Sequence, residues 1–348
     1  MNNYKCEIVA DSKNAFGDRI TTFKLTYPRI VHAELMTHRM FSRNAASSRA
    51  VPISKMIESV KNNMFIPLAV QKAHKGMQGS EYFKGEQLEQ AKQLWIESAE
   101  LALQQAEKMK EFGITKQLIN RILEPYQYYQ VLVTATEWEN FFKLRCPNYV
   151  FHDENEEYSF RSKKDAIKHF PENMDVEYET GNKFLKDLNQ LDWLNVNQSQ
   201  AEIHIQAVAE AMWDAYNEST PKQLEAGEWH IPFGDNFDTK MLSKTCQNLK
   251  IPVLSWEDGE EIKVKIATAR CARVSYTVIG ENKEHNYEAD IKLHDKLMSS
   301  GHWSPFEHCA KAMSERDLDN YLVIKNGLTI PVMCDNFQGF ISYRSLLN

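Results

Sequence analysis

The chain has 348 residues, of which 43% are hydrophobic and 26% are charged, and its formal net charge is −7 at pH 7. These proportions are ordinary for a globular protein, and the acidic balance argues against a general nucleic-acid-binding surface. No apolar run approaches the roughly 20 residues that span a bilayer, and residues 1–14 lack a signal-peptide core. Six cysteines without a Cys-x-x-Cys pair favour reduced thiols and give no support for structural zinc. We therefore expect a soluble, cytoplasmic protein that does not bind a membrane.

The N-terminal part of the sequence predicts two strands followed by a run of helices. Residues 4–10 and 20–28 have strand composition with partial alternation. Helical segments are expected from Pro28, from Pro52, over 86–112, from Lys116 and over 136–145. Gly113 is placed as the stop of the longest helix. On the last helix we expect one apolar side, made by Trp138, Phe141, Phe142 and Leu144.

The second half begins with a polar stretch, residues 146–198, which we interpret as an inserted and partly irregular region. Further along, the predictions are an amphipathic helix over 201–220, a loop over 227–238, a strand or short helix over 264–276, a helix over 290–301 and a terminal strand region with a turn at Asn326-Gly327. The pattern predicts the α+β class, as one intertwined domain with an insertion.

The stretch THRMFSRNAASSRAVP (37–52) concentrates three arginines among small hydroxyl and amide side chains and contains no acidic residue. Arginine forks and serine hydroxyls suit phosphate oxygens, so one interpretation is an anion site at Ser47 and Arg49. The alternative is a surface loop with local hydrogen bonds, because short runs of serine and arginine are common.

The stretch GHWSPFEH (301–308) places two histidines and a carboxylate around a proline turn. A metal site made by His302, Glu307 and His308 matches no known ligand spacing. Helix capping by Ser304, with a proline at the first helical position, is the favoured interpretation.

Three other residues have a functional interpretation and a simpler structural one. Arg145 ends an apolar helix, where an arginine also caps the last carbonyls. Cys146 could attack a pyrimidine, but no base lies near it in the sequence, so packing is favoured. His230 could face a ligand, although its neighbours Trp229 and Phe233 favour a packed loop.

The stretch HRMFSRNAASSR resembles the signature of the flavin-dependent thymidylate synthases (ThyX), an Arg-His-Arg followed by seven residues and a serine. His38, Arg39 and Ser47 match this signature. Thr37 stands in place of its first arginine, and Ala45 in place of the glutamate before its serine. Arg43 is expected to compensate for the missing arginine from a neighbouring turn.

The resemblance extends beyond the signature. Residues 93–125 look like the family's long helix, glycine turn and Arg-Ile-Val-Leu-Pro stretch, which maps a substrate-site arginine onto Arg121. Residues 136–145 resemble its Asn-x-x-x-x-Leu-Arg helix, which maps a flavin-contacting asparagine onto Asn140 and the catalytic arginine onto Arg145. Residues 200–212 look like its Ala-Gln-x-Glu-Ile helix.

Two matching motifs are out of order. ARCARVSY (269–276) and the segment 293–308 look like the family's N-terminal portion, yet here they follow the signature. We interpret this order as a circular permutation, which preserves a site when the old termini can be joined. The family positions then imply flavin contacts for Ser275, His302 and Ser304.

The resemblance implies a ThyX-like fold, with a central antiparallel sheet and long helices, and a single catalytic domain over 1–348. The insertion covers about 146–198 and the permuted portion about 262–348. The implied reaction moves a one-carbon unit from 5,10-methylenetetrahydrofolate to C5 of dUMP, with FAD as cofactor and NADPH as reductant, in a homotetramer. No metal is implied.

The resemblance also implies roles for individual residues. Flavin contacts are implied for His38, Arg39, Asn140, Ser275, His302 and Ser304, and a cation at the first two favours the anionic reduced flavin. Nucleotide contacts are implied for Glu34, Ser47, Ser48, Arg49, Arg121 and Arg145. Arg145, with Arg121, would stabilise the charge that develops on the pyrimidine.

The departures from the signature leave two alternatives open. Glu34 stands where the family often has glutamine, and a carboxylate facing the base would favour the amino group of cytosine. This favours dCMP as substrate, or a hydroxymethyl product, as in a nucleotide hydroxymethylase. The second alternative is an inactive relative that binds flavin or nucleotide.

Overall fold

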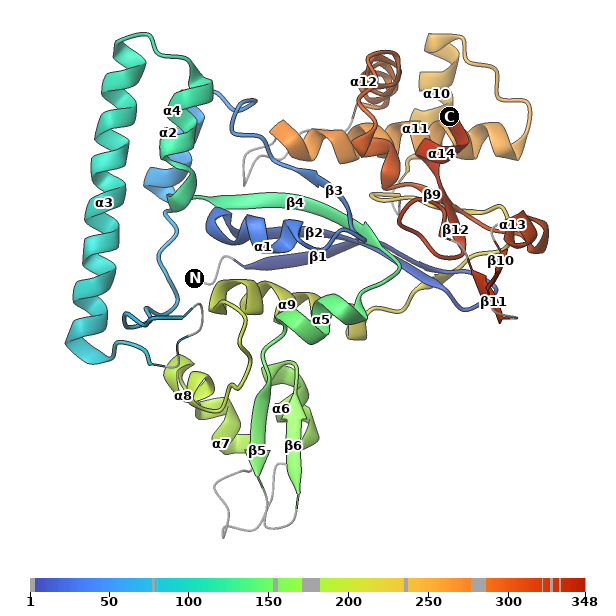
Figure 1. The fold of residues 1–348 in the computed structure, drawn as a ribbon. Helices are drawn as coiled ribbons and strands as arrows, with labels where there is room; N and C mark the ends of the chain where they lie inside the picture. The colour runs from blue at the N-terminus through green and yellow to red at the C-terminus, as the bar shows by residue number, and fades with distance from the viewer. Residues whose placement is uncertain are drawn as a thin grey trace.

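The computed structural model describes residues 4–76, 79, 81–152, 156–170, 182–234, 237–276, 286–320, 322–325, 328–331 and 333–347. Its centre is a five-stranded sheet in the order β3-β4-β2-β1-β7 (Figure 1). The strands are β1 (Lys5–Lys13), β2 (Arg19–Pro28), β3 (Ser42–Ala45), β4 (Tyr128–Ala135) and β7 (Lys222–Gln223). Every neighbouring pair is antiparallel except β1 with the short β7. The predicted α+β class with a central antiparallel sheet is confirmed.

Helices cover both faces of this sheet (Figure 1). On one face, Val131 and Val133 of β4 pack in a core with α5 (Glu139–Arg145) and α9 (Ile203–Glu218). On the other, Leu132 packs against Cys271 of α11 (Trp256–Arg273). Successive side chains of a strand point to opposite faces, so β4 must be apolar on both sides.

Three helices stand together beside the sheet (Figure 1). They are α2 (Ile53–Asn62), α3 (Gly85–Glu111) and α4 (Lys116–Ile122), and they share one apolar cluster that includes Val60, Leu103 and Ile119. Gly113 has φ +88°, the left-handed conformation that ends a helix and favours glycine. The predicted glycine stop of the longest helix is confirmed.

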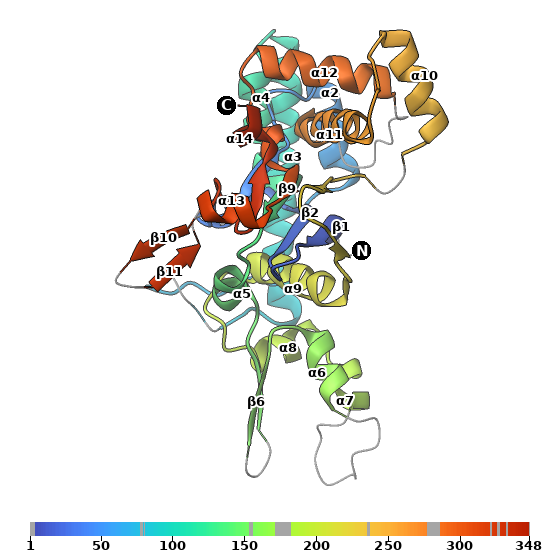
Figure 2. The ribbon, with the colours of Figure 1, turned by 90° about the vertical axis from the view of Figure 1, so that its right-hand side faces the viewer.

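The remaining C-terminal elements lie over the α11 face and at the far end of the sheet (Figure 2). They are β8 (Trp229–His230), α10 (Thr239–Leu249), η3 (Val274–Tyr276), α12 (Tyr287–Ser299), η4 (Ser304–Glu307), β9 (Ala310–Ala312), α13 (Glu315–Asn320), β10 (Leu322–Lys325), β11 (Leu328–Pro331), β12 (Phe340–Ser342) and α14 (Tyr343–Leu347). This part contains a three-stranded sheet in the order β12-β9-β8. Gly301 closes the α12 segment with φ +70°.

The described part of residues 146–198, which the sequence predicts as an insertion, forms a small unit below α5 and α9 (Figures 1 and 2). It contains β5 (Tyr149–His152), β6 (Glu157–Phe160), α6 (Lys163–His169), α7 (Asn182–Asp187) and α8 (Gln190–Asn195). Tyr149, Phe151, Phe170 and Trp193 form its separate core. The described part is therefore more regular than the sequence predicted.

Several predictions need correction. The strand β4, in the middle of the sheet, was not assigned from the sequence, and neither were β3 and α10. Residues 264–276 are neither a strand nor a short helix, because they continue the 18-residue helix α11 into η3. Leu144 is 52% exposed and does not share the buried side of Trp138, Phe141 and Phe142. The predicted turn at residues 326–327 lies outside the described residues.

Among the described residues, no helix combines the length and the hydropathy needed to cross a bilayer. All six cysteines are free thiols, as the sequence predicted. The helical segment predicted from Pro28 consists of η1 (Arg29–Val31) and α1 (His32–Met36). The segment predicted from Lys116 ends in η2 (Glu124–Tyr126).

Candidate functional site

The signature stretch runs along the edge of the central sheet. After α1 the chain turns at Thr37 and His38, forms β3 beside β4, and turns again over residues 46–51 before α2. A four-residue edge strand with a turn at each end presents its side chains to segments that pack on the sheet.

Asn44 connects this stretch to the two motifs that are out of order in the sequence. Its side chain is 6% exposed, and its Nδ2 donates to the carbonyl of Cys271 at 2.5 Å. Its Oδ1 accepts from the hydroxyl of Ser275 at 3.0 Å and lies 3.5 Å from that of Ser304. The backbone N–H of Ser47 also donates to the carbonyl of Ser275 at 2.8 Å. The signature, η3 and η4 therefore meet at one buried amide.

A second contact brings α4 to the turn that follows β3. Asn120 donates from Nδ2 to the carbonyls of Ser48 and Val51, at 2.6 and 2.9 Å. The next residue, Arg121, is exposed on α4. The helix that carries Arg121 is thereby fixed against the turn that carries Ser48 and Arg49.

Three predicted arginines are open to solvent. Arg39, Arg49 and Arg121 are exposed, and within the described residues none of them forms an ion pair with a carboxylate. Exposed arginine forks without a carboxylate partner suit anions such as phosphate.

Arg145 is bound to the first turn of the signature. Its Nε donates to Nε2 of His38 at 3.1 Å, and its Nη2 donates to the hydroxyl of Thr37 at 3.3 Å. Burial, followed by the nearby charges of Arg145 and Arg43, lowers the pKa of His38 to about 4. His38 is therefore neutral near pH 7 and accepts a hydrogen bond, so it does not supply the positive charge expected of it, and the charge expected from Arg39 stays a prediction.

Arg43 binds the backbone of the same turn. Its Nη1 donates to the carbonyls of Met36 and His38, at 2.8 and 3.3 Å. Arg43 therefore uses these donors to hold the turn. To compensate for the missing signature arginine, it would have to direct them at a ligand instead.

The other predicted residues differ in their exposure and in their bonds. Asn140 is exposed on α5, and His302 is exposed with its Nδ1 bonded to the Ser300 hydroxyl at 2.9 Å. Glu34 is half-buried, and its Oε2 is buried without a hydrogen-bond partner among the described residues. The predicted cap at Ser304 is wrong, because Trp303 is the N-cap of η4 and makes no side-chain bond there.

Two residues that the sequence analysis assigned to packing are buried. Cys146 is 3% exposed, and burial raises the pKa of its thiol, which makes it a poor nucleophile. His230 is fully buried, as predicted, but it lies in the short strand β8 and not in a loop. Across the described part of the chain, no three His, Cys, Asp or Glu side chains come together as a metal site.

His230 belongs to a buried chain of hydrogen bonds between the sheet and the elements above it. Its Nδ1 bonds the hydroxyl of Ser12 at 2.9 Å, and its Nε2 bonds that of Thr22 at 2.8 Å. The Thr22 and Thr134 hydroxyls are 2.8 Å apart, and Thr134 reaches Nδ1 of His308 at 2.8 Å. Burial lowers the pKa of each histidine to about 3, so both rings are neutral.

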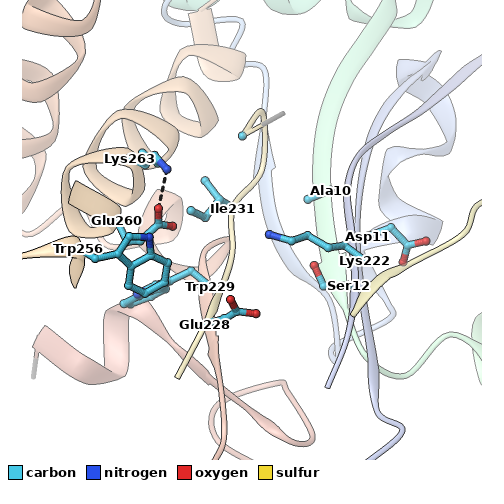
Figure 3. Close-up of a pocket in the computed structure, with 11 residues that line it drawn as sticks. Ala10, Asp11, Ser12, Lys222, Glu228, Trp229, Ile231, Trp256, Glu260 and Lys263 are labelled. Atoms are coloured by element: carbon cyan, nitrogen blue, oxygen red, sulfur yellow. Dashed lines mark hydrogen bonds and ion pairs between the residues drawn. The ribbon is translucent and has the colours of Figure 1, made fainter. Parts of the chain in front are cut away.

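A cavity of about 180 Å³ is lined by none of the residues of the signature stretch 37–52 (Figure 3). Its walls include Asp11, Ser12, Lys222, Trp229 and Glu260, and Glu260 forms an ion pair with Lys263 at 2.5 Å. None of the residues predicted from the sequence as site residues lines it. The largest concentration of predicted residues is on the β3 edge instead.

Residues 16–172 match the sequence profile of the family described as "Thymidylate synthase complementing protein" (Thy1). The match contains the signature, α3, α4 and α5, and it ends inside the inserted region. The family recognised from the motifs is confirmed for this segment.

Solved structures similar to the chain include a UMP/dUMP methylase PolB from Streptomyces cacaoi bound with 5-Br UMP. It is 16% identical, with 63% of this chain and 90% of that chain covered and a TM-score of 0.39. The same methylase bound with 5-Br dUMP is also 16% identical, with 57% and 66% covered and a TM-score of 0.34. No curated protein sequence matches the chain.

Sequence reasoning missed two contributors to this site. Asn44 was not singled out from the sequence, because no local pattern showed that its amide would be buried and would need hydrogen-bond partners. Thr37 was treated as a loss of charge, whereas its hydroxyl contacts Arg145.

Proposed function

We propose that this protein is a flavin-dependent enzyme that transfers a one-carbon unit from 5,10-methylenetetrahydrofolate to C5 of dUMP, forming dTMP. The Thy1 match of residues 16–172 supports the enzyme class. The observation that carries the proposal is the convergence on Asn44, where the signature meets Ser275 and Ser304 from segments more than 200 positions away in the sequence. A surface loop with only local hydrogen bonds would not need these contacts.

The convergence also supports the proposed permutation. In this proposal the chain is one catalytic domain, in which the portion from about residue 262 supplies motifs that elsewhere in the family precede the signature. The insertion at about 146–198 is an addition with its own small core. Permuted segments can rebuild a site because side-chain positions depend on packing and not on chain order.

FAD would be held by the residues to which the family resemblance assigns flavin contacts, of which Ser275 and Ser304 meet at Asn44. Exposed arginines without carboxylate partners in the described part of the chain suit the two phosphates, and Arg39 is the signature member of this set. Asn140, His302, Ser275 and Ser304 would hold the rest of the cofactor. When bound, FAD supplies the hydride for the transferred carbon, and NADPH supplies the electrons that reduce the flavin.

The nucleotide would lie on the side of Ser47 and Arg49. Their hydroxyl and guanidinium would bind the phosphate, with Ser48 in the same turn and Arg121 from the adjoining helix. Arg145 would donate to the pyrimidine and stabilise the negative charge that develops when C5 becomes nucleophilic. Cys146 has no role in this scheme.

One observation favours a changed substrate or product. The buried Oε2 of Glu34 has no partner among the described residues, and an unpaired carboxylate oxygen is available to accept from an amino group. Cytosine offers such a donor where uracil offers an acceptor. A dCMP or dUMP hydroxymethylase is therefore the second candidate, and an inactive binding relative is the third.

We further propose a homo-oligomer in a reducing, cytoplasmic compartment. Leu94, Leu101 and Phe112 expose 68%, 59% and 86% of their surface on or just after the long helix α3, which suits contact with another copy. Six free cysteines suit a reducing environment.

The test is to purify the protein, add FAD and record its absorbance, then supply NADPH and methylenetetrahydrofolate with dUMP or dCMP. Bound flavin and conversion of dUMP to dTMP, measured by mass spectrometry, are expected. A product heavier by one oxygen assigns the hydroxymethylase, and conversion of dCMP assigns the changed base. A protein that takes up no flavin contradicts both enzyme proposals.

A further inference from the structure

The guanidinium of Arg145 is held along one edge by two consecutive residues. Nε donates to Nε2 of His38 at 3.1 Å, and Nη2 donates to Oγ1 of Thr37 at 3.3 Å. Nε and Nη2 form the side edge of the planar guanidinium group, so two acceptors on one turn are matched to two parallel donors.

Both acceptors are fixed in that role by their other contacts. The Thr37 hydroxyl donates its single proton to the carbonyl of Glu34 at 2.6 Å, which leaves its lone pairs for Arg145. The His38 ring stacks on Phe41, with centroids 5.7 Å apart, and meets the edge of Phe141 at 4.9 Å. With Nε2 accepting, the neutral ring carries its proton on Nδ1.

The end edge of Arg145 remains available. One Nη2 hydrogen and both Nη1 hydrogens have no acceptor among the described residues, and no carboxylate there pairs with this arginine. A guanidinium fixed on its side edge presents its end edge as a second, parallel pair of donors. That edge is suited to two oxygens, or an oxygen and a ring nitrogen, of a bound base.

We propose that Thr37 and His38 are positioning residues that orient Arg145 toward the nucleotide. This inference rests on the proposed function. An arginine at position 37, as in the family signature, has only donors and could not accept from Arg145. The threonine therefore converts this position from a donor to an acceptor, and it gives the chain its own way of orienting Arg145.

The first test compares Thr37→Val, which keeps the shape and removes the hydroxyl, with Thr37→Ser, which keeps the hydroxyl. Affinity for dUMP is measured by calorimetry on the flavin-loaded full chain. Because the contact is exposed, we expect T37V to weaken binding about 3- to 10-fold, the range of one ordinary hydrogen bond, and T37S to restore it. Thr245→Val, which removes a hydroxyl from α10, is the matched control and is expected to leave affinity unchanged.

Repeating T37V in an Arg145→Lys background separates positioning from general structure. A lysine has no fork to orient, so T37V is expected to change affinity by less than about 2-fold there. The same loss in both backgrounds, or wild-type affinity in T37V alone, would overturn the proposal.

A second measurement keeps this inference independent of the proposed function. In arginine-labelled protein, the Arg145 Nε–H signal is identified by its disappearance in R145K. We expect this hydrogen to exchange with water more slowly than those of exposed Arg39 and Arg49, and to lose that protection in His38→Ala but not in His38→Gln. Unprotected exchange in the wild type refutes the positioning role, whereas protection with no dUMP binding refutes the proposed function alone.

Discussion

His38 at the edge of the sheet and the pair His230 and His308 in its interior are neutral histidines that serve different purposes. His38 lies at the edge of the sheet, and its pKa is lowered to about 4 by burial together with the charges of Arg145 and Arg43. His230 and His308 lie in the interior, where burial lowers each pKa to about 3. The first accepts from a partly exposed arginine, and the others bond threonine and serine hydroxyls.

This difference shows that the role of a neutral histidine depends on which groups the sheet places beside it. Thr22 and Thr134 are opposite each other on β2 and β4, so their hydroxyls form a buried polar pair that needs partners. His230 and His308 satisfy that pair from the two ends. His38 instead follows a short helix at the rim, where the C-terminal arginine of α5 can reach it.

The largest effect is expected at the rim. Arg145→Met should lower turnover of the nucleotide about 100- to 1,000-fold, because a preorganised donor to developing charge is removed, while the unfolding free energy changes little. Lys143→Met, on the exposed side of the same helix, is the control. Steady-state kinetics and urea unfolding measure the two quantities, and equal activities of the two variants would contradict the assignment.

The interior histidines should affect stability instead. His230→Leu is expected to reduce the unfolding free energy by about 2–4 kcal/mol, because the Ser12 and Thr22 hydroxyls lose a buried partner. His302→Leu changes an exposed ring and should cost less than about 0.5 kcal/mol. Urea unfolding tests this pair, and similar midpoints would mean that the buried chain contributes nothing.

The two groups also differ in their effect on pH dependence. The pKa of each interior histidine is lower in the folded state than the ordinary value near 6.5, so the stability from its neutral form is complete above about pH 6.5. It decreases as pH falls toward about 3, by up to about 1.4 kcal/mol per pH unit for each ring. His308→Asn removes one titrating ring, so the unfolding free energy should then decrease less steeply between pH 6.5 and 4.5. An unchanged slope would contradict a neutral buried His308.

The smallest effects compare two hydroxyls on one acceptor. Ser275 lies 3.0 Å from Oδ1 of Asn44, and Ser304 lies 3.5 Å from it. Ser275→Ala should cost about 1 kcal/mol of unfolding free energy, and Ser304→Ala less than about 0.5 kcal/mol, because the longer contact is at the limit of a hydrogen bond. Thermal and urea unfolding of both variants measure these losses. A larger loss in Ser304→Ala would contradict this order and would mean that Asn44 is oriented mainly by Ser304.

The sequence by itself determined the elements with strong local signals. Helical periodicity predicted α3, α9 and α12, and glycines at 113 and 301 marked where two of these segments end. The chemical pattern of the signature, with arginines, serines and no acid, pointed to the edge on which most of the predicted site residues were later found. These features depend on neighbours a few positions apart, which is the range that a sequence pattern reports.

Only the tertiary structure decided the rest. The apolar run of β4 does not alternate, because helices cover both of its faces, so its local pattern did not reveal the strand in the middle of the sheet. Asn44 meets Ser275 and Ser304 across 231 and 260 positions, and no local rule predicts such contacts. Thr37 is a lost charge in the sequence and an acceptor for Arg145 in the fold, because the C-terminus of α5 packs against its turn.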